Sequence, residues 1–250
     1  MYNATFVSDL HLGSKHCQAD KLYDFLKNLK TKKLYLVGDI LDGWRLKKKW
    51  YWPKSHNKVV KLILDMAKDI EVVYITGNHD EFLRTSMAKS VKINKLTIKN
   101  RCTYYGLDGK KYLVVHGDIF DYLMKFKFGR WIMHIGDLAY DFLMYINIYV
   151  NSFRRLFNLN YWSLTKYMKI KSKNATNWSL GKFLENFETQ MTRYCSRKGY
   201  DGIICGHIHN PTINIHSGIV YMNDGDWVDN CSALVEDSSG NWSIIYYDEE

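Results

Sequence analysis

The sequence predicts an α/β fold that is built on a mostly parallel sheet and interrupted by a helical insertion. In the first half, short runs rich in Val, Ile, Leu, Tyr and Phe alternate with segments whose apolar residues recur at helical spacing. The stretch from about 119 to 195 has no clear strand pattern and holds much of the aromatic excess. At 250 residues, the chain is long enough for one sizeable domain or for a domain with an insertion.

Five of the apolar runs end in residues of the types that bind metal ions. They read ATFVSDLH, LYLVGDILD, VVYITGNHD, YLVVHGD and GIICGHIH. The segments 19–30 and 57–69, which follow the first two runs, are the predicted crossover helices. Turn residues separate the later runs IVYMND, CSALVED and WSIIYYD, which predicts antiparallel pairing near the end of the chain.

Charge and cysteine content narrow the class of protein. The formal net charge of +9 predicts attraction to anions such as phosphate esters, nucleic acid or an acidic membrane surface. The five cysteines form no CxxC pair and the N-terminus has no signal-peptide pattern, so we expect a cytoplasmic protein with reduced thiols. A transmembrane helix over 131–150 is rejected, because it would bury His134, Asp137 and Asp141 in the bilayer.

The residues at the ends of the five runs are expected to meet, because open α/β sheets bind ligands beyond the carboxyl ends of their strands. Asp9 and His11 are two residues apart, so on an extended segment both point to one face. Asp39 is expected to bridge two ions with its two oxygens. The predicted metal ligands are Asp9, His11, Asp39, Asn78, His116, His207 and His209. Imidazole and hard oxygen without thiolate favour two divalent ions, manganese first, with iron or zinc as alternatives.

Two such ions, roughly 3.5–4 Å apart, clamp a phosphoryl group and lower the pKa of an attacking water, which is what phosphoester hydrolysis demands. The order D-x-H, G-D, G-N-H-D, H-G-D and G-H-x-H resembles the calcineurin-like metallophosphoesterase superfamily over the whole chain except the insertion. The resemblance implies a four-layer αββα sandwich formed by 1–118 and 200–250, with a helical lid over 119–199.

The resemblance also implies a role for each residue of the clusters. One ion would be held by Asp9, His11, Asp39 and His209, and the other by Asp39, Asn78, His116 and His207. His79 corresponds to a histidine that protonates or stabilises the leaving oxygen, with Asp80 positioning it. His79, Asp80 and Asn78 are therefore the expected catalytic residues.

A finer resemblance is to the UDP-2,3-diacylglucosamine diphosphatase-like group, bacterial hydrolases related to lipid A synthesis. It rests on SDLHLG, GDILDGW, GNHDEFLR, HGDIFD, YWSL, DGIICGHIH and NDGDWVDNCSALVE. This resemblance implies that a pyrophosphate is hydrolysed to UMP and 2,3-diacylglucosamine 1-phosphate. The lipid A enzymes themselves carry arginine in place of His79, and GNHD matches the wider superfamily and a paralogous subgroup.

Side chains outside the clusters are candidates for substrate binding. Arg84 is expected to grip phosphate bidentately, with a surface ion pair as the alternative. Trp44 and Arg45 either border the pocket or pack locally. Three lid lysines are candidates to meet phosphate or an anionic membrane, with a solvated surface position as the alternative for each, namely Lys166, Lys169 and Lys173. The aromatic lid either contacts acyl chains or the inner face of the cytoplasmic membrane peripherally, or is a helical pair packed on the core.

Other functions stay open on the residues alone. One alternative is a general metallophosphodiesterase or phosphomonoesterase with another substrate. A nuclease would use the basic charge, but the aromatic residues form no evident stacking platform on strands, so nucleic acid is not an expected partner. A non-catalytic metal-bound scaffold is the last alternative. It predicts missing ligands, and none is missing. The sequence does not specify an oligomeric state.

Overall fold

The computed structural model describes residues 1–86, 92–121, 146, 149–150, 153–154, 157 and 179–247. The chain divides into two compact units, Met1–Ile119 with Met191–Glu250, and Phe120–Gln190. Most of the second unit, and with it most of the predicted lid and the segment 131–150, lies outside the described residues. No helix in the described part of the chain is long and apolar enough to cross a membrane.

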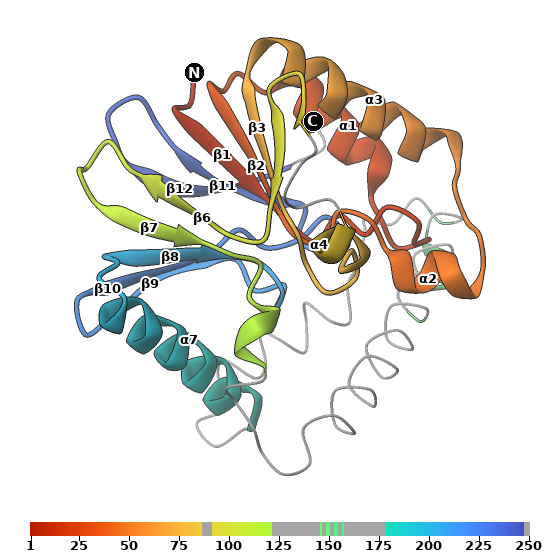
Figure 1. Cartoon of the computed structure of the whole chain (residues 1–250). Helices are drawn as coiled ribbons and strands as arrows, with labels where there is room; N and C mark the ends of the chain where they lie inside the picture. Colours follow the sequence, from red (N-terminus) through yellow and green to blue (C-terminus); the bar gives the residue numbers. More distant parts are fainter. Residues whose placement is uncertain are drawn as a thin grey trace. The chain divides into compact units, whose positions relative to one another are not determined.

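The first unit follows the alternating order that the sequence predicts (Figure 1). Its helices are α1 (Ala19–Asn28), α2 (Gly43–Lys48), α3 (Lys54–Asp69), α4 (Phe82–Ser86), a 3-10 turn (Asp118–Phe120) and the end of α7 (Ser179–Arg197). Its strands are β1 (Ala4–Val7), β2 (Lys33–Val37), β3 (Glu71–Ile75), β4 (Lys92–Ile93), β5 (Leu96–Lys99), β6 (Cys102–Tyr105), β7 (Lys111–Val114), β8 (Gly202–Cys205), β9 (Thr212–His216), β10 (Ile219–Asn223), β11 (Ser232–Glu236) and β12 (Trp242–Tyr246). All five runs that end in metal-type ligands are strands, as predicted.

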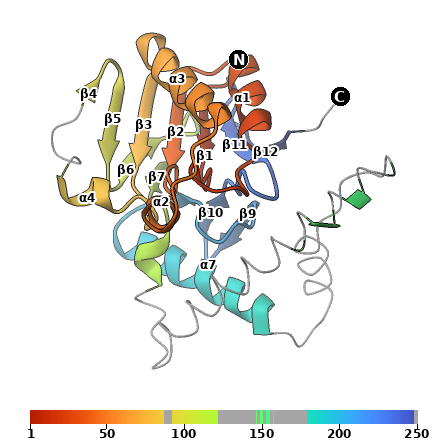
Figure 2. The ribbon, with the colours of Figure 1, turned by 90° about the vertical axis from the view of Figure 1, so that its right-hand side faces the viewer.

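The strands form two sheets. One has seven strands in the order β12-β11-β1-β2-β3-β5-β4, with β1, β2, β3 and β5 parallel. The other has five strands in the order β6-β7-β8-β10-β9. The predicted crossover helices are α1 and α3, which lie side by side over one face of the larger sheet (Figure 2).

The C-terminal pairing is only partly as expected. β11 pairs antiparallel with both β1 and β12, which confirms the prediction for those strands. For β10 the prediction is confirmed on one side only, because β10 pairs antiparallel with β9 and parallel with β8. The antiparallel partner of β10 is β9, a strand without a clear apolar run whose five positions are all half-exposed or exposed.

Alternating side chains of each central strand build two cores. On β2, Leu34 and Leu36 face the core under α1 and α3, whereas Tyr35 and Val37 face the core between the two sheets. The end of α7 that belongs to this unit buries Met191 and Cys195 beside the smaller sheet. The layers therefore follow the predicted αββα order, and both faces of β1, β2 and β3 are covered.

One buried carboxylate ties the two sheets together. Glu236, on β11 of the larger sheet, is fully buried and accepts hydrogen bonds from Asn3 Nδ2 at 2.5 Å and from the backbone N–H of Leu107 at 2.8 Å. The hydroxyl of Tyr104, on β6 of the smaller sheet, also donates to it. Three donors from separate segments thus depend on one side chain.

Glu236→Ala is expected to lower the free energy of unfolding by about 3 kcal/mol, because it leaves these buried donors without an acceptor. Urea denaturation measures this loss. The matched control is Glu71→Ala at the exposed start of β3, where the ion pair with Lys33 is half exposed and should contribute less than about 1 kcal/mol. Equal losses in the two variants would contradict a special role for Glu236.

Candidate metal centre

The carboxyl ends of five strands, β1, β2 and β3 from one sheet and β7 and β8 from the other, meet as the sequence predicts. Three groups of side chains there each bring one ligand atom per residue within 4.8 Å of the others. They are Asp9–His11–His209, His11–Asp39–His79 and Asp39–His116–His207. Every predicted Asp and His ligand belongs to a group, and Asp39 belongs to two.

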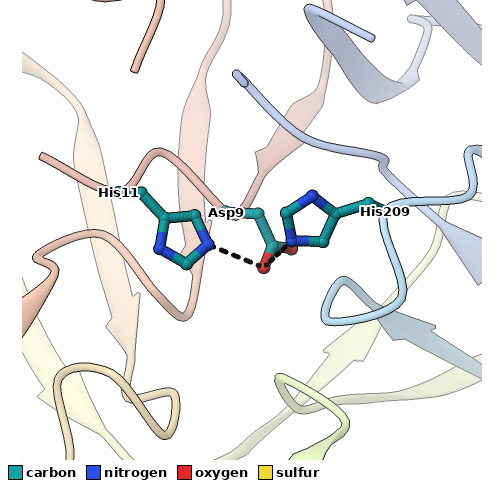
Figure 3. Close-up of side chains that lie close together, drawn as sticks. All are labelled: Asp9, His11 and His209. Carbon is teal, nitrogen blue, oxygen red and sulfur yellow. Dashed lines mark ion pairs between the residues drawn. The ribbon is translucent and has the colours of Figure 1, made fainter. Parts of the chain in front are cut away.

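Asp9 presents one oxygen to the site and anchors the other. Its Oδ2 accepts hydrogen bonds from Ser8 Oγ at 2.6 Å and from the backbone N–H of His207 at 2.8 Å. Its Oδ1 faces His209 Nε2 at 3.2 Å and His11 Nε2 at 3.7 Å, so the carboxylate lies between the two rings (Figure 3). This arrangement leaves Oδ1 available as a ligand.

Asp39 is shared between the groups through a single oxygen. Its Oδ1 accepts the backbone N–H of His79 at 2.9 Å, and the expected bridge between two ions through both oxygens stays a prediction. Its Oδ2 faces the Nε2 atoms of His116 at 3.2 Å, His79 at 3.9 Å and His11 at 4.0 Å. Gly77 makes this approach possible, because a Cβ there would lie 2.1 Å from Asp39 Oδ1.

His116 is fully buried and its tautomer is determined by a backbone group. Its Nδ1 lies 2.9 Å from the carbonyl oxygen of Val37 and must donate to it, which leaves the lone pair of Nε2 directed at the site. The side-chain oxygen of Asn78 is also buried and has no hydrogen-bond partner among the described residues. Both residues therefore have a free donor atom for a cation.

Left-handed backbone conformations gather at the ligands. In the described part of the chain, five of the eight non-glycine residues with positive φ are predicted ligands, namely Asp9, His11, Asp39, His207 and His209. Asp9 and His11 thus reach one place through left-handed turns after β1 rather than on an extended segment, which corrects the expectation. Such conformations cost about 1–3 kcal/mol each and persist where the surroundings determine them, typically at functional sites.

Three buried atoms of the predicted ligands test whether a cation fits. Asp9 Oδ1, Asn78 Oδ1 and His116 Nε2 have no hydrogen-bond partner among the described residues. Buried polar atoms are normally bonded, so three unbonded lone-pair donors among the predicted ligands need an explanation. Divalent ions supply it, because each atom is a lone-pair donor of the right chemical type.

In the ion-free protein, raised pKa values keep ligand imidazoles protonated, and their positive charge balances the carboxylates of the site. Burial alone would lower the pKa of His11, but hydrogen bonds with Asp42 and Asp9 raise it to about 10. At His116, burial would again lower the pKa, but the charges of Asp39 and Asp9 raise it well above its usual value. The same imidazoles, against the effect of burial, hold the pKa of Asp39 below its usual range. The carboxylates are thus neutralised by imidazolium groups.

Metal uptake by the ion-free protein is therefore expected to release about one proton per ion at pH 7.5, because a ligating imidazole must be neutral. Since the pKa values of His11 and His116 are raised, the apparent affinity should increase as the pH rises from 6 toward 9. Calorimetric titrations with Mn²⁺ in buffers of different ionisation enthalpy measure the proton count. Identical heats in all buffers would contradict this protonated apo state.

The ring of His79 is held by Asp42. Its Nδ1 lies 3.0 Å from Asp42 Oδ1, which leaves Nε2 facing Asp39. The expected positioning by Asp80 is wrong, because the carboxylate of Asp80 accepts from Tyr74 Oη, from the backbone N–H of Ile40 and from the backbone N–H of Gly77. Asp80 instead ties the loop after β2 to the loop after β3.

Of the six predicted substrate contacts, the three in the described part of the chain are Trp44, Arg45 and Arg84. The Trp44 ring covers His79, with ring centroids 4.2 Å apart, and Arg45 Nε lies 3.2 Å from Asp42 Oδ2. Both therefore border the site, and their contact with substrate stays a prediction. The guanidinium of Arg84 makes a bidentate pair with Asp118 at 2.8 and 2.9 Å. The ion pair that was the alternative to phosphate binding is therefore the one that the structure shows.

Sequence reasoning missed several residues that support the ligands. Asp42 caps α2 by accepting from the backbone N–H of Arg45, and the D-x-x-D spacing after β2 was the available signal. Asp226 lies 3.7 Å from His209 Nδ1, and the only sequence signal for it is the acidic segment NDGD near the end of β10, which belongs to one of the motifs that carry the family resemblance. The predicted lid contacts Lys166, Lys169 and Lys173 lie outside the described residues.

Comparisons with known proteins agree with this geometry. A family profile described as calcineurin-like phosphoesterase matches residues 2–211. The chain is 23% identical to a UDP-2,3-diacylglucosamine hydrolase of Haemophilus influenzae (strain PittGG), covering 98% of this chain and 99% of that protein. It is 27% identical to a UDP-2,3-diacylglucosamine hydrolase of Aliivibrio fischeri (strain MJ11), covering 92% of each. A solved phosphoesterase of E. coli, Yfce, is 14% identical over 98% of this chain and 99% of that one, with a TM-score of 0.44.

The matched region carries the Asp and His ligands at the ends of β1, β2, β3, β7 and β8, and the two hydrolase relatives cover nearly the whole chain. The chain therefore belongs to the calcineurin-like phosphoesterase family and is a metal-dependent phosphoester hydrolase.

Proposed function

We propose that the protein hydrolyses the pyrophosphate bond of a nucleotide-linked acylated sugar such as UDP-2,3-diacylglucosamine. The observation that carries the proposal is that Asp39 belongs to two ligand groups, one with His11 and His79 and one with His116 and His207, while His11 also joins Asp9 and His209 in a third. The names of the two curated relatives support the choice of substrate, because both cover more than nine tenths of this chain. Water adds to one phosphorus, the P–O bond of the anhydride breaks, and UMP and the acylated sugar 1-phosphate leave.

The residues divide this work between holding ions and handling protons. Asp9, His11, Asp39 and His209 would hold one divalent ion, and Asp39, Asn78, His116 and His207 the other, with manganese our first choice. Bound ions would supply Lewis-acid stabilisation of the phosphoryl group and a water of lowered pKa. His79 presents Nε2 to the same region, while Asp42 holds Nδ1, so the ring is oriented to give a proton to a leaving oxygen.

A general phosphodiesterase is the second candidate, and His79 is the observation that favours it. An oriented imidazole can transfer a proton to an alkoxide, whereas an arginine at this place can only stabilise charge. A pyrophosphate leaves as a stabilised phosphate and needs less protonation than an alkyl ester does. The Asp42–His79 pair therefore suits ester substrates at least as well as anhydrides.

The Mn²⁺-loaded protein separates these two candidates when it is assayed on UDP-2,3-diacylglucosamine and on a generic phosphodiester. The expected result is UMP release from the lipid at a kcat/KM about 10²-fold or more above that for the generic diester, because only the lipid supplies binding energy away from the reacting phosphorus. Turnover of the diester without UMP release from the lipid would remove the lipid substrate and leave the phosphodiesterase.

A peripheral contact with an anionic membrane remains part of the proposal for such a lipid substrate. The basic net charge of +9 supports it. Flotation with vesicles of anionic and of neutral phospholipid tests it directly. Binding to the anionic vesicles that is lost at high salt is the expected outcome, and equal absence from both kinds of vesicle would contradict it.

A further inference from the structure

The two ligand groups of the proposed metal centre differ in charge. The Asp9 site, which consists of Asp9, His11, His209 and the shared Asp39, has a carboxylate of its own. The His116 site, which consists of His116, His207, Asn78 and the shared Asp39, has the neutral amide of Asn78 instead. The affinity of an oxygen-rich site for a divalent cation increases with ligand charge and with rigidity. This difference therefore favours the Asp9 site.

The groups behind the imidazoles add to the difference. His209 Nδ1 faces Asp226 Oδ2 at 3.7 Å, whereas His116 Nδ1 donates to the uncharged carbonyl of Val37. A carboxylate on the far nitrogen raises the basicity of a ligating imidazole more than a carbonyl does. His11 also has a carboxylate, Asp42, at 3.5 Å, but that group is paired with Arg45 as well.

Asp226 is fully buried and firmly held. Its Oδ1 accepts the backbone N–H groups of Val228 at 2.9 Å and of Asn230 at 3.2 Å. The side-chain amide of Asn230 donates both to Asp226 and to the carbonyl oxygen of His209, the latter at 3.1 Å. Asn230 thus holds the backbone of His209, and Asp226 faces its ring.

The same acidic segment, residues 223–230, also holds the second ligand of this site. Asp224 lies 2.6 Å from Ser8 Oγ, and that hydroxyl lies 2.6 Å from Asp9 Oδ2. The backbone N–H of Trp227 donates to the carbonyl oxygen of Asp9 at 3.1 Å. Asp9 and His209 are therefore positioned by one continuous segment.

The carboxylates beside the His116 site are already bonded elsewhere. Asp80 accepts from Tyr74, Ile40 and Gly77, and Asp118 is paired with Arg84. Neither faces the far nitrogen of His116, which is bonded to Val37. They therefore do not offset the charge that Asp9 and Asp226 bring to the other site.

We infer that the Asp9 site binds a divalent cation more tightly and fills first, and that Asp226 is the positioning residue that establishes this order. The inference rests on the proposed two-metal centre and concerns the relative occupancy of its two sites. It predicts a protein that carries one ion at low metal concentration and two at high concentration.

Calorimetric titration of the ion-free full-length protein with Mn²⁺ tests the inference without any substrate. Wild type should bind two ions in steps that differ at least about tenfold in affinity. Asp9→Asn should remove the tight step and keep the weak one. Asp226→Asn, which keeps an oxygen to accept the loop N–H groups, should weaken the tight step about 10–100-fold and leave the weak step unchanged.

Two further variants keep the result interpretable. Asp69→Asn, at the exposed end of α3, makes the same change of charge far from the ligands and should alter neither step. Asn230→Ala leaves both carboxylates in place and loosens His209, so it should weaken the tight step less than Asp226→Asn does. Circular dichroism of each ion-free variant identifies any that fail to fold, and Asn230→Ala then carries the test of the segment.

The outcomes separate the inference from the proposed function. Two steps of equal affinity, or an equal effect of Asp226→Asn on both steps, would overturn the order of filling and leave the two-metal centre intact. Loss of the weak step in Asp9→Asn with the tight step retained would also overturn the order. A wild-type protein that binds no Mn²⁺ would overturn the proposed function itself.

Discussion

Asp39→Asn is expected to reduce kcat/KM for phosphoester hydrolysis about 10³-fold or more, which corresponds to about 4 kcal/mol of transition-state stabilisation. The reason is geometric, because Asp39 Oδ2 is the one oxygen that faces imidazoles of both ligand groups. The substitution keeps the size of the side chain and an oxygen to accept the N–H of His79. It removes the charge that both ions would share.

The measurement pairs steady-state kinetics with metal analysis of the purified variant. Asp39→Asn should lose metal in both sites together, whereas Asp69→Asn on the exposed end of α3 should retain both metal and activity. Undiminished hydrolysis by Asp39→Asn would mean that the measured activity comes from another site or from a contaminant. Retention of one ion with loss of activity would show that Asp39 serves only one group.

The strands that could be predicted from the sequence are those in which a buried apolar run is followed directly by a metal ligand. The runs that became β1, β2, β3, β7 and β8 are apolar because both of their faces are buried, and each ends where its ligand begins. Periodicity alone could not assign these strands to two sheets. That assignment depends on the pairing of β1 with β11 and of β7 with β8, which join segments far apart along the chain.

The ligands of the site were predictable for the same reason, whereas their partners were not. Asp9, Asp39 and His116 occupy fixed positions after strands, so order along the chain identifies them. The partner of His79 proved to be Asp42, from a helix cap 37 residues away, rather than the adjacent Asp80. For Arg84 the sequence leaves phosphate binding and an ion pair as alternatives, because it cannot show that Asp118 lies within reach.

His79→Gln is expected to lower kcat about 10²–10⁴-fold on phosphodiesters with an alkyl leaving group, with much less effect on metal binding. Its Nδ1 is bonded to Asp42 and its Nε2 lies 3.9 Å from Asp39 Oδ2, so the ring is oriented toward the site rather than needed to complete either ligand group. Glutamine keeps a polar side chain of similar reach but cannot transfer a proton. Metal analysis and kinetics of the same preparation measure the two effects separately.

Comparing esters with different leaving groups is the control, because a purely structural role of His79 would lower the activity on all of them equally. A p-nitrophenyl ester leaves as a stabilised phenolate and needs little protonation, so His79→Gln should lose far less activity on that substrate than on an alkyl ester. Asp42→Asn should show the same dependence with a smaller loss, about 10–100-fold, because it only disturbs the orientation of the ring. Equal losses on both esters would contradict proton transfer by His79 and would indicate that the ring supports the ions or the shape of the site. A pyrophosphate substrate should behave like the p-nitrophenyl ester in this test, because its leaving group is also stabilised. The activity that His79→Gln loses on each substrate therefore indicates which class of substrate depends on proton transfer by His79.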